Sequence, residues 1–145
     1  MNKDVRVVPT HTLQAGLGAV VAYDARRPVD ENAVAMAEAA AAVRSGAVAR
    51  ASRNASIGPV EVEQGQFLGL VEGEPVTAGP TRDPVAREVV DLLSQADPEV
   101  LTILLGEEAG DTDAFVDAIR TAHPELEVEV HEGGQPHYPL LFGAE

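Results

Sequence analysis

One stretch in the last third of the chain constrains the fold more than any other part of the sequence. Residues 100–105 form a nearly continuous apolar run, which is typical of a strand covered on both faces. Apolar residues at helical spacing follow at 115–122, and residues 126–130 then alternate between apolar and acidic side chains, as an edge or half-exposed strand does. A strand, a helix and a strand in this order predict parallel pairing with a right-handed crossover.

Two helices are predicted in the first third of the chain. The apolar spacing within residues 12–23 indicates the first helix, in which Gly16 and Gly18 serve close packing. Asp30 is placed to cap the second helix, and Gly46 is placed to stop it.

Two later helices have clear start and stop signals. Asp83-Pro84 opens the first of them, because proline suits the first helical position, and Pro98 ends it. Asp111 or Thr112 caps the second, which carries the helical pattern described above, and Pro124 lies beyond its end.

The remaining segments are predicted to be strands. Residues 5–8 are a short β-branched run, residues 47–79 follow a period of two around a hairpin loop at 72–75, and residues 138–142 form the last strand. The fold class is therefore α/β, with a mixed, largely parallel sheet flanked by helices and a β-hairpin insertion. The length fits a single domain that spans residues 1–145.

Charge restricts the classes of partner. The net charge is −14, from 24 acidic and 10 basic residues, so the phosphates of nucleic acids and of anionic membranes would repel the surface. We therefore expect no nucleic acid and no membrane insertion, and a protein partner with a basic patch fits better. The chain has no cysteine, and we expect a cytoplasmic protein.

Motifs that carry chemistry are missing from the sequence. There is no phosphate-binding glycine loop, no Gly-x-Ser-x-Gly elbow and no zinc-type histidine spacing. The acidic run at 107–113 lacks the pattern of a calcium loop and fits a solvated loop that leads into a helix cap. Surface or capping roles are favoured over metal binding for the histidines, which are His11, His123, His131 and His137.

Two segments are harder to explain as plain scaffold. Residues 9–12 follow the predicted first strand, and ligands and partners of open α/β sheets gather at the carboxyl ends of strands. Residues 132–139 combine paired glycines, which permit positive φ, with two prolines that stiffen the chain around Gln135, His137 and Tyr138. A tight turn into the last strand is the alternative interpretation of this second segment.

These segments carry a resemblance to a known family. Residues 7–10, followed by Gly16-Leu17, resemble the Val-x-Val-Pro-Thr and Gln-Gly-Leu segments of the A subunits of fatty-acid kinases, a family long labelled dihydroxyacetone-kinase-like. Residues 65–73 resemble its Gly-Asp-Phe-Leu-Gly hairpin and residues 102–107 its penultimate strand. The most specific match is the closing segment at 128–140, Val-Glu-Val-His-Glu-Gly-Gly-Gln-Pro-His-Tyr-Pro-Leu.

The resemblance covers the C-terminal domain of that family and implies its role. In the complete family member, an N-terminal domain binds ATP and magnesium, and the C-terminal domain is thought to engage a fatty-acid-binding B subunit, whose bound fatty acid becomes an acyl phosphate. We therefore expect this chain to be one part of a longer protein, to contain no ATP or magnesium site, and to catalyse no reaction alone.

The resemblance and the loop chemistry together give the candidate partner-binding residues. Their expected role is shape and hydrogen bonding, with the tyrosine as an anchor, because amphipathic aromatic side chains often dominate interfaces. The predicted site consists of Pro9, Thr10, Thr12, Gly133, Gly134, Gln135, Pro136, His137 and Tyr138.

The sequence departs from the family pattern at several positions. Ala15 stands where the family has glutamine, and Gln14 lies one position earlier. His137 and Leu140 also differ from the residues that are common in the family, so partner choice is expected to differ if these side chains form the contact surface.

Two other functions remain open at this point. Backbone N–H groups of the glycine turn would cradle a small anion, such as phosphate or an acyl head group, in the first of them. In the second, the chain is a structural domain that forms a homodimer.

Overall fold

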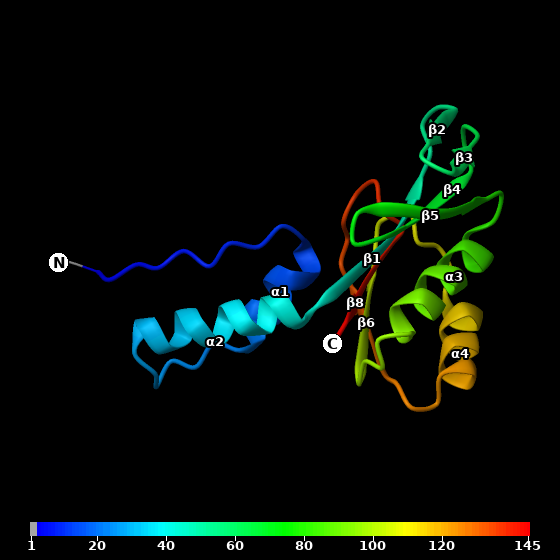
Figure 1. The fold of residues 1–145 in the computed structure, drawn as a ribbon. Coiled ribbons are helices and arrows are strands. Elements are labelled where there is room, and N and C mark those ends of the chain that lie inside the picture. The colour runs from blue at the N-terminus through cyan, green and yellow to red at the C-terminus, as the bar shows by residue number, and fades with distance from the viewer. Residues whose placement is uncertain (1–2) are drawn as a thin grey trace. The chain divides into compact units, whose positions relative to one another are not determined.

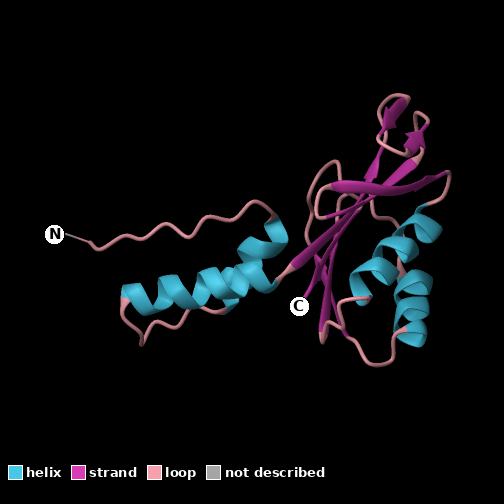
Figure 2. Cartoon of the chain, viewed as in Figure 1, coloured by secondary structure: helices cyan, strands magenta, loops and turns pink. Residues whose placement is uncertain are grey.

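The computed structural model describes residues 3–145, and their contacts fall into two compact units that divide between Arg44 and Ser45. The predicted strand at residues 5–8 is wrong. In the described chain these residues form a loop, drawn in pink in Figure 2, and Val7 is 85% exposed. A β-branched run favours extended backbone, but a strand also needs a neighbour for its N–H and C=O groups.

The first unit is a pair of packed helices, α1 (Leu13–Val21) and α2 (Val29–Ala42) (Figure 1). A Cβ atom on Gly18 would lie 2.8 Å from Val43 Cγ2, which confirms the close-packing role predicted for this glycine. Thr12 caps α1, and its side chain accepts a hydrogen bond from the Ala15 N–H at 3.0 Å.

A buried asparagine holds the connection between these helices. Asn32 is 5% exposed; its Oδ1 accepts from the Asp24 N–H at 3.0 Å, and its Nδ2 donates to the Asp24 carbonyl at 2.8 Å. Hydrogen bonds from the Arg26 side chain and backbone keep the pKa of the Asp24 carboxyl below its ordinary value.

The second helix ends at Ala42, before the predicted stop at Gly46, because Arg44 already begins a strand.

The second unit is built on a six-stranded sheet of order β5-β4-β1-β8-β6-β7. These strands are β1 (Arg44–Arg50), β4 (Phe67–Val71), β5 (Glu74–Gly79), β6 (Val100–Leu105), β7 (Glu127–Glu132) and β8 (Leu140–Ala144). The hairpin predicted around residues 72–75 is formed by β4 and β5. A separate hairpin, β2 (Ala55–Ile57) and β3 (Val60–Val62), contacts β5 through β3.

The α/β class and the mixed sheet are confirmed, but the sheet is not largely parallel. The pair β6–β7 is parallel, as the strand–helix–strand pattern predicted, whereas β1–β4, β4–β5 and β6–β8 are antiparallel. The physical reason lies in the connections. A short turn joins β4 to β5 and returns the chain antiparallel, and the loop after β7 reverses the chain again, so that β8 runs opposite to β6. Only the crossover through α4 makes a parallel neighbour.

Two helices, α3 (Arg82–Ser94) and α4 (Asp113–Ala122), lie side by side on one face of this sheet (Figure 1). Thr112 is the N-cap of α4, as predicted, whereas α3 begins one residue before Asp83 and has Thr81 as its N-cap. Apolar residues of both helices and of the inward strand positions form the core. Its largest fully buried side chains include Phe142, Leu93, Leu101, Ile103, Ile119 and Leu140.

Glycine at position 46 permits the contact between α3 and the sheet. A Cβ atom on Gly46 would lie 2.7 Å from Val89 Cγ1 and 2.8 Å from Leu93 Cδ1, and both side chains are fully buried. We expect Gly46→Ala to lower the free energy of unfolding by about 1–3 kcal/mol, because the added methyl overpacks the core.

Denaturant unfolding measures this effect, with Gly79→Ala as the matched control. The same methyl on Gly79 would meet Val85 Cγ2 at 3.4 Å, an ordinary contact distance. If Gly46→Ala is no less stable than Gly79→Ala, the close approach of α3 to β1 is not limited by this glycine.

Candidate partner-binding site

The loop at residues 133–139 lies over the carboxyl end of β6. It has to cross that end because β7 and β8, which it joins, lie on opposite sides of β6. The N–H groups of Gly133 and Gly134 both donate to the Leu105 carbonyl at 2.9 Å. The Gly106 N–H donates to the Pro139 carbonyl at 2.9 Å, so the loop is hydrogen-bonded to β6 and its continuation at both ends.

Gln135 ties the middle of this loop to its own ends. Its Nε2 donates to the Leu104 carbonyl and to the Tyr138 carbonyl, each at 3.1 Å, while its backbone carbonyl accepts from the Glu107 N–H at 3.1 Å. Its Oε1 is buried and has no hydrogen-bond partner among the described residues. The side chain therefore points inward and positions the loop, a role that differs from the partner contact expected from the sequence.

Two glycines leave room for this arrangement. A Cβ atom on Gly106 would collide with the Tyr138 carbonyl and lie 2.8 Å from the Gln135 carbonyl. A Cβ atom on Gly133 would collide with Gln135 Oε1 and lie 3.2 Å from Leu104 Cβ. Larger residues at either position would push the loop away from β6.

The exposed part of the loop is a tight turn formed by Pro136, His137 and Tyr138, which we call the loop tip. The Tyr138 N–H donates to the Pro136 carbonyl at 2.8 Å, and His137 has φ +70°, a conformation that L-residues seldom adopt. Tyr138 is 42% exposed, and the next residue, Pro139, is fully buried. The anchored ends thus hold a strained, rigid tip toward solvent, with the carboxylates of Glu107, Glu108 and Glu132 exposed on the adjoining residues.

The other predicted segment belongs to the first unit. Pro9 and Thr10 are exposed, and Thr12 is occupied as the N-cap of α1. The structure therefore brings residues 133–138 together in one loop, while residues 9–12 lead into α1.

The sequence reasoning missed Gly106, which seats the loop. A glycine directly after a buried apolar strand is a signal for close backbone approach and would have indicated this contact.

The hydrogen bonds of the loop also bear on the anion-binding alternative, because the N–H groups of Gly133 and Gly134 already donate to the Leu105 carbonyl. Neither donor is free to cradle a phosphate.

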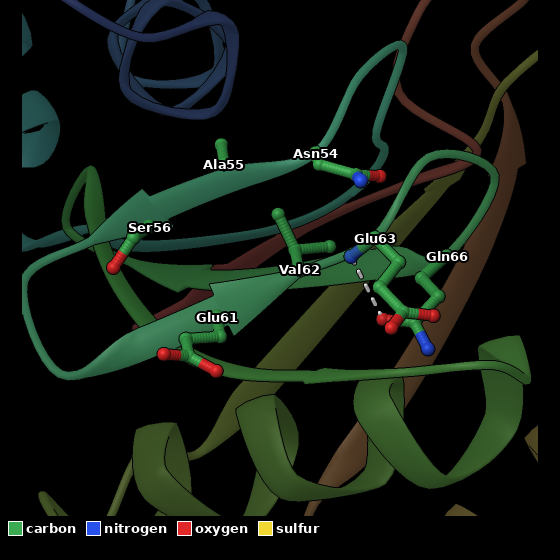
Figure 3. Close-up of a pocket in the computed structure, with 7 residues that line it drawn as sticks. All are labelled: Asn54, Ala55, Ser56, Glu61, Val62, Glu63 and Gln66. Carbon is green, nitrogen blue, oxygen red and sulfur yellow. Dashed lines mark hydrogen bonds between the residues drawn. The ribbon is translucent and has the colours of Figure 1, made fainter.

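A separate open hollow lies beside the β2–β3 hairpin (Figure 3). Two of its polar side chains accept hydrogen bonds from the local backbone: Asn54 Oδ1 accepts from the Gln64 N–H at 2.7 Å, and Gln66 Oε1 accepts from the Glu63 N–H at 3.0 Å. The lining residues are Asn54, Ala55, Ser56, Glu61, Val62, Glu63 and Gln66.

Residues 3–145 show neither a metal-ligand cluster nor a membrane span. No group of three or more His, Cys, Asp or Glu side chains in this range is placed to hold a metal ion. None of the helices there combines the length and the apolar character that crossing a membrane requires.

Comparison with known proteins decides the family. The model of the FakA-like C-terminal family, described as the C-terminal part of fatty acid kinase A-subunit-like proteins, matches residues 1–145. The chain belongs to this family. The loop at 133–139 is thus part of a FakA-like C-terminal region.

Curated relatives are much longer than this chain. An uncharacterized protein of Staphylococcus haemolyticus (strain JCSC1435) is 35% identical over 144 residues, which cover 98% of the chain and 26% of that protein. An uncharacterized protein of Staphylococcus aureus (strain USA300) is 34% identical over 141 residues, which cover 96% of the chain and 26% of that protein. The chain spans about a quarter of the length of these relatives.

Replacement of Gln135 tests whether its side chain holds the loop. We expect Gln135→Ala to lower the free energy of unfolding by about 1–3 kcal/mol, because two hydrogen bonds to backbone carbonyls are lost. The amides of Gly106 and Gly133 should also exchange faster with solvent, which amide hydrogen exchange measures.

Gln95→Ala is the matched control, since Gln95 is an exposed glutamine at the end of α3. Equal stability and equal exchange rates in the two variants would contradict the positioning role of Gln135.

Proposed function

We propose that this chain is a docking domain that binds a fatty-acid-binding B subunit through the loop tip. A separate ATP domain then phosphorylates the carboxylate of the bound fatty acid. Membership of the FakA-like C-terminal family supports an accessory role in such a kinase. In this proposal ATP and magnesium bind in another part of the longer protein, and the complex acts in the cytoplasm.

The strained loop tip is the observation that carries the proposal. A histidine at φ +70° costs conformational energy, and a connection between two strands does not require it. The hydrogen bonds to Leu104, Leu105 and Gly106 hold the tip in one conformation before any partner arrives. A loop ordered in advance loses less entropy on binding, which favours affinity.

The exposed side chains give the tip the character of a protein-binding surface. Tyr138 presents an aromatic ring and a hydroxyl group, and amphipathic aromatic residues often act as anchors at interfaces. Pro136 restricts the backbone beside it. The nearby carboxylates of Glu107, Glu108 and Glu132 favour a basic surface on the partner.

Removal of the tyrosine ring tests the anchor. We expect Tyr138→Ala to weaken B-subunit binding at least about tenfold, which corresponds to about 1.4 kcal/mol. Titration calorimetry with the purified B subunit measures the dissociation constant.

Ile57→Ala is the matched control for that measurement. Ile57 is 41% exposed, close to the 42% of Tyr138, but lies in the β2–β3 hairpin. Equal affinities of the two variants would contradict an anchor at Tyr138, and no binding by the folded wild-type chain would contradict the docking function.

Relief of the backbone strain tests the loop conformation separately. We expect His137→Gly to raise the free energy of unfolding by up to about 1 kcal/mol, because glycine adopts positive φ without the Cβ penalty. The same change makes the tip more mobile, so B-subunit affinity should fall. Thermal unfolding and calorimetry report the two effects.

Asp97→Gly provides the control, because Asp97 also has positive φ, at 51°, and lies beyond the end of α3. It should gain similar stability and bind the B subunit normally. A His137→Gly variant that binds as tightly as the wild type would show that tip rigidity is unimportant.

A further inference from the structure

The two edges of the six-stranded sheet differ in how they are protected. Strand β5 contains Pro75, its pairing with β4 is irregular between Gly69 and Leu70, and the β3 strand contacts it. Proline, irregular pairing and a covering segment are the usual means of blocking an edge strand. Strand β7, at the opposite edge, contains no proline and stays in register with β6 over all its residues, from Glu127 to Glu132.

The backbone of β7 directs alternate groups away from β6. The Glu127 N–H donates to the Glu99 carbonyl and the Gly133 N–H to the Leu105 carbonyl, so odd-numbered residues face β6. Since strand residues alternate in direction, the N–H and C=O groups of Val128, Val130 and Glu132 point to the open edge. These groups form a row onto which another strand can add.

One cation already lies at this edge. Arg120, on α4, donates from Nη2 to the Val128 carbonyl at 3.3 Å. Its side chain is exposed, so an incoming strand displaces it at little cost. The outward carbonyl of Val128 is therefore accessible to a hydrogen-bond donor on a cationic side chain.

The side chains of β7 select the strand that can pair. Val128 and Val130 pack against the core on one face, while Glu127, Glu129 and His131 are exposed on the other. Directly opposite residues of paired strands lie close enough for like charges to repel and opposite charges to attract. The carboxylates thus oppose acidic strands and favour strands with cations at alternate positions.

We propose that the free edge of β7 binds an extended segment of a partner protein that carries Lys or Arg at alternate positions. The segment adds as a further strand beside β7. A second copy of this chain is a poor occupant, because antiparallel pairing of two β7 strands would oppose their carboxylates and each chain carries a net charge of −14. The proposal is independent of B-subunit docking at the loop tip and needs no B subunit for its test.

A designed peptide provides the probe. We would titrate the isotope-labelled chain with acetyl-Lys-Thr-Lys-Val-Lys-Thr-amide and measure amide hydrogen exchange by NMR. With free peptide at about nine times its dissociation constant, exchange at Val128, Val130 and Glu132 should slow about tenfold, while the β5 amides stay unchanged. The acidic peptide acetyl-Glu-Thr-Glu-Val-Glu-Thr-amide is the matched control and should give no slowing.

Two variants make the test specific. Glu132→Pro removes an outward N–H at an exposed edge position, where proline is tolerated, and should weaken binding of the basic peptide. The double variant Glu127→Lys and Glu129→Lys should reverse the preference and bind the acidic peptide instead.

Three results would overturn the proposal. The first is unchanged exchange at the β7 amides in saturating basic peptide, and the second is equal binding of the two peptides. The third is slow exchange at those amides without peptide, together with a dimeric mass, which would make a second copy the occupant.

Discussion

The insertion of β8 between β1 and β6 holds the second unit together. Without it, the antiparallel strands β1, β4 and β5 would have no hydrogen-bonded connection to the β6–β7 pair. The side chain of Phe142, on β8, is fully buried. The centroid of its ring lies 6.3 Å from the ring centroid of Phe115 on α4. The end of the chain is also paired, because Glu145 and Val100 exchange backbone hydrogen bonds in both directions.

The candidate site follows from this topology. A chain that leaves β7 and must enter the sheet on the far side of β6 has to pass over the end of β6. The polar backbone groups at that end then need partners, and the loop supplies them through Gly133, Gly134 and the side chain of Gln135. The crossing therefore creates a rigid loop, and the strain at His137 is concentrated at its exposed tip.

The two surfaces proposed for binding use different physical means. The loop tip offers a preformed shape with an aromatic side chain. The β7 edge offers a row of backbone N–H and C=O groups, and the carboxylates beside them favour basic strands over acidic ones. Both have acidic surroundings, so both favour positively charged partners. Because Gly133 directly follows Glu132, one partner can contact both surfaces, and the variants Tyr138→Ala and Glu132→Pro distinguish their contributions.

Local patterns determined most of the helices and strands, whereas long-range pairing was decided only by the tertiary structure. The run at 100–105 and the alternation at 126–130 predicted β6 and β7 with their parallel pairing, because each pattern reflects which faces become buried. Residues 5–8 have the composition of a strand but no strand neighbour, and β8 pairs antiparallel with the much earlier β6. The glycines and prolines of 133–139 marked the unusual loop, but the inward direction of Gln135 depends on its contact with distant β6. Sequence periodicity records which face of a helix or strand is buried. It does not record which strand lies beside it, because that pairing depends on how the whole chain packs.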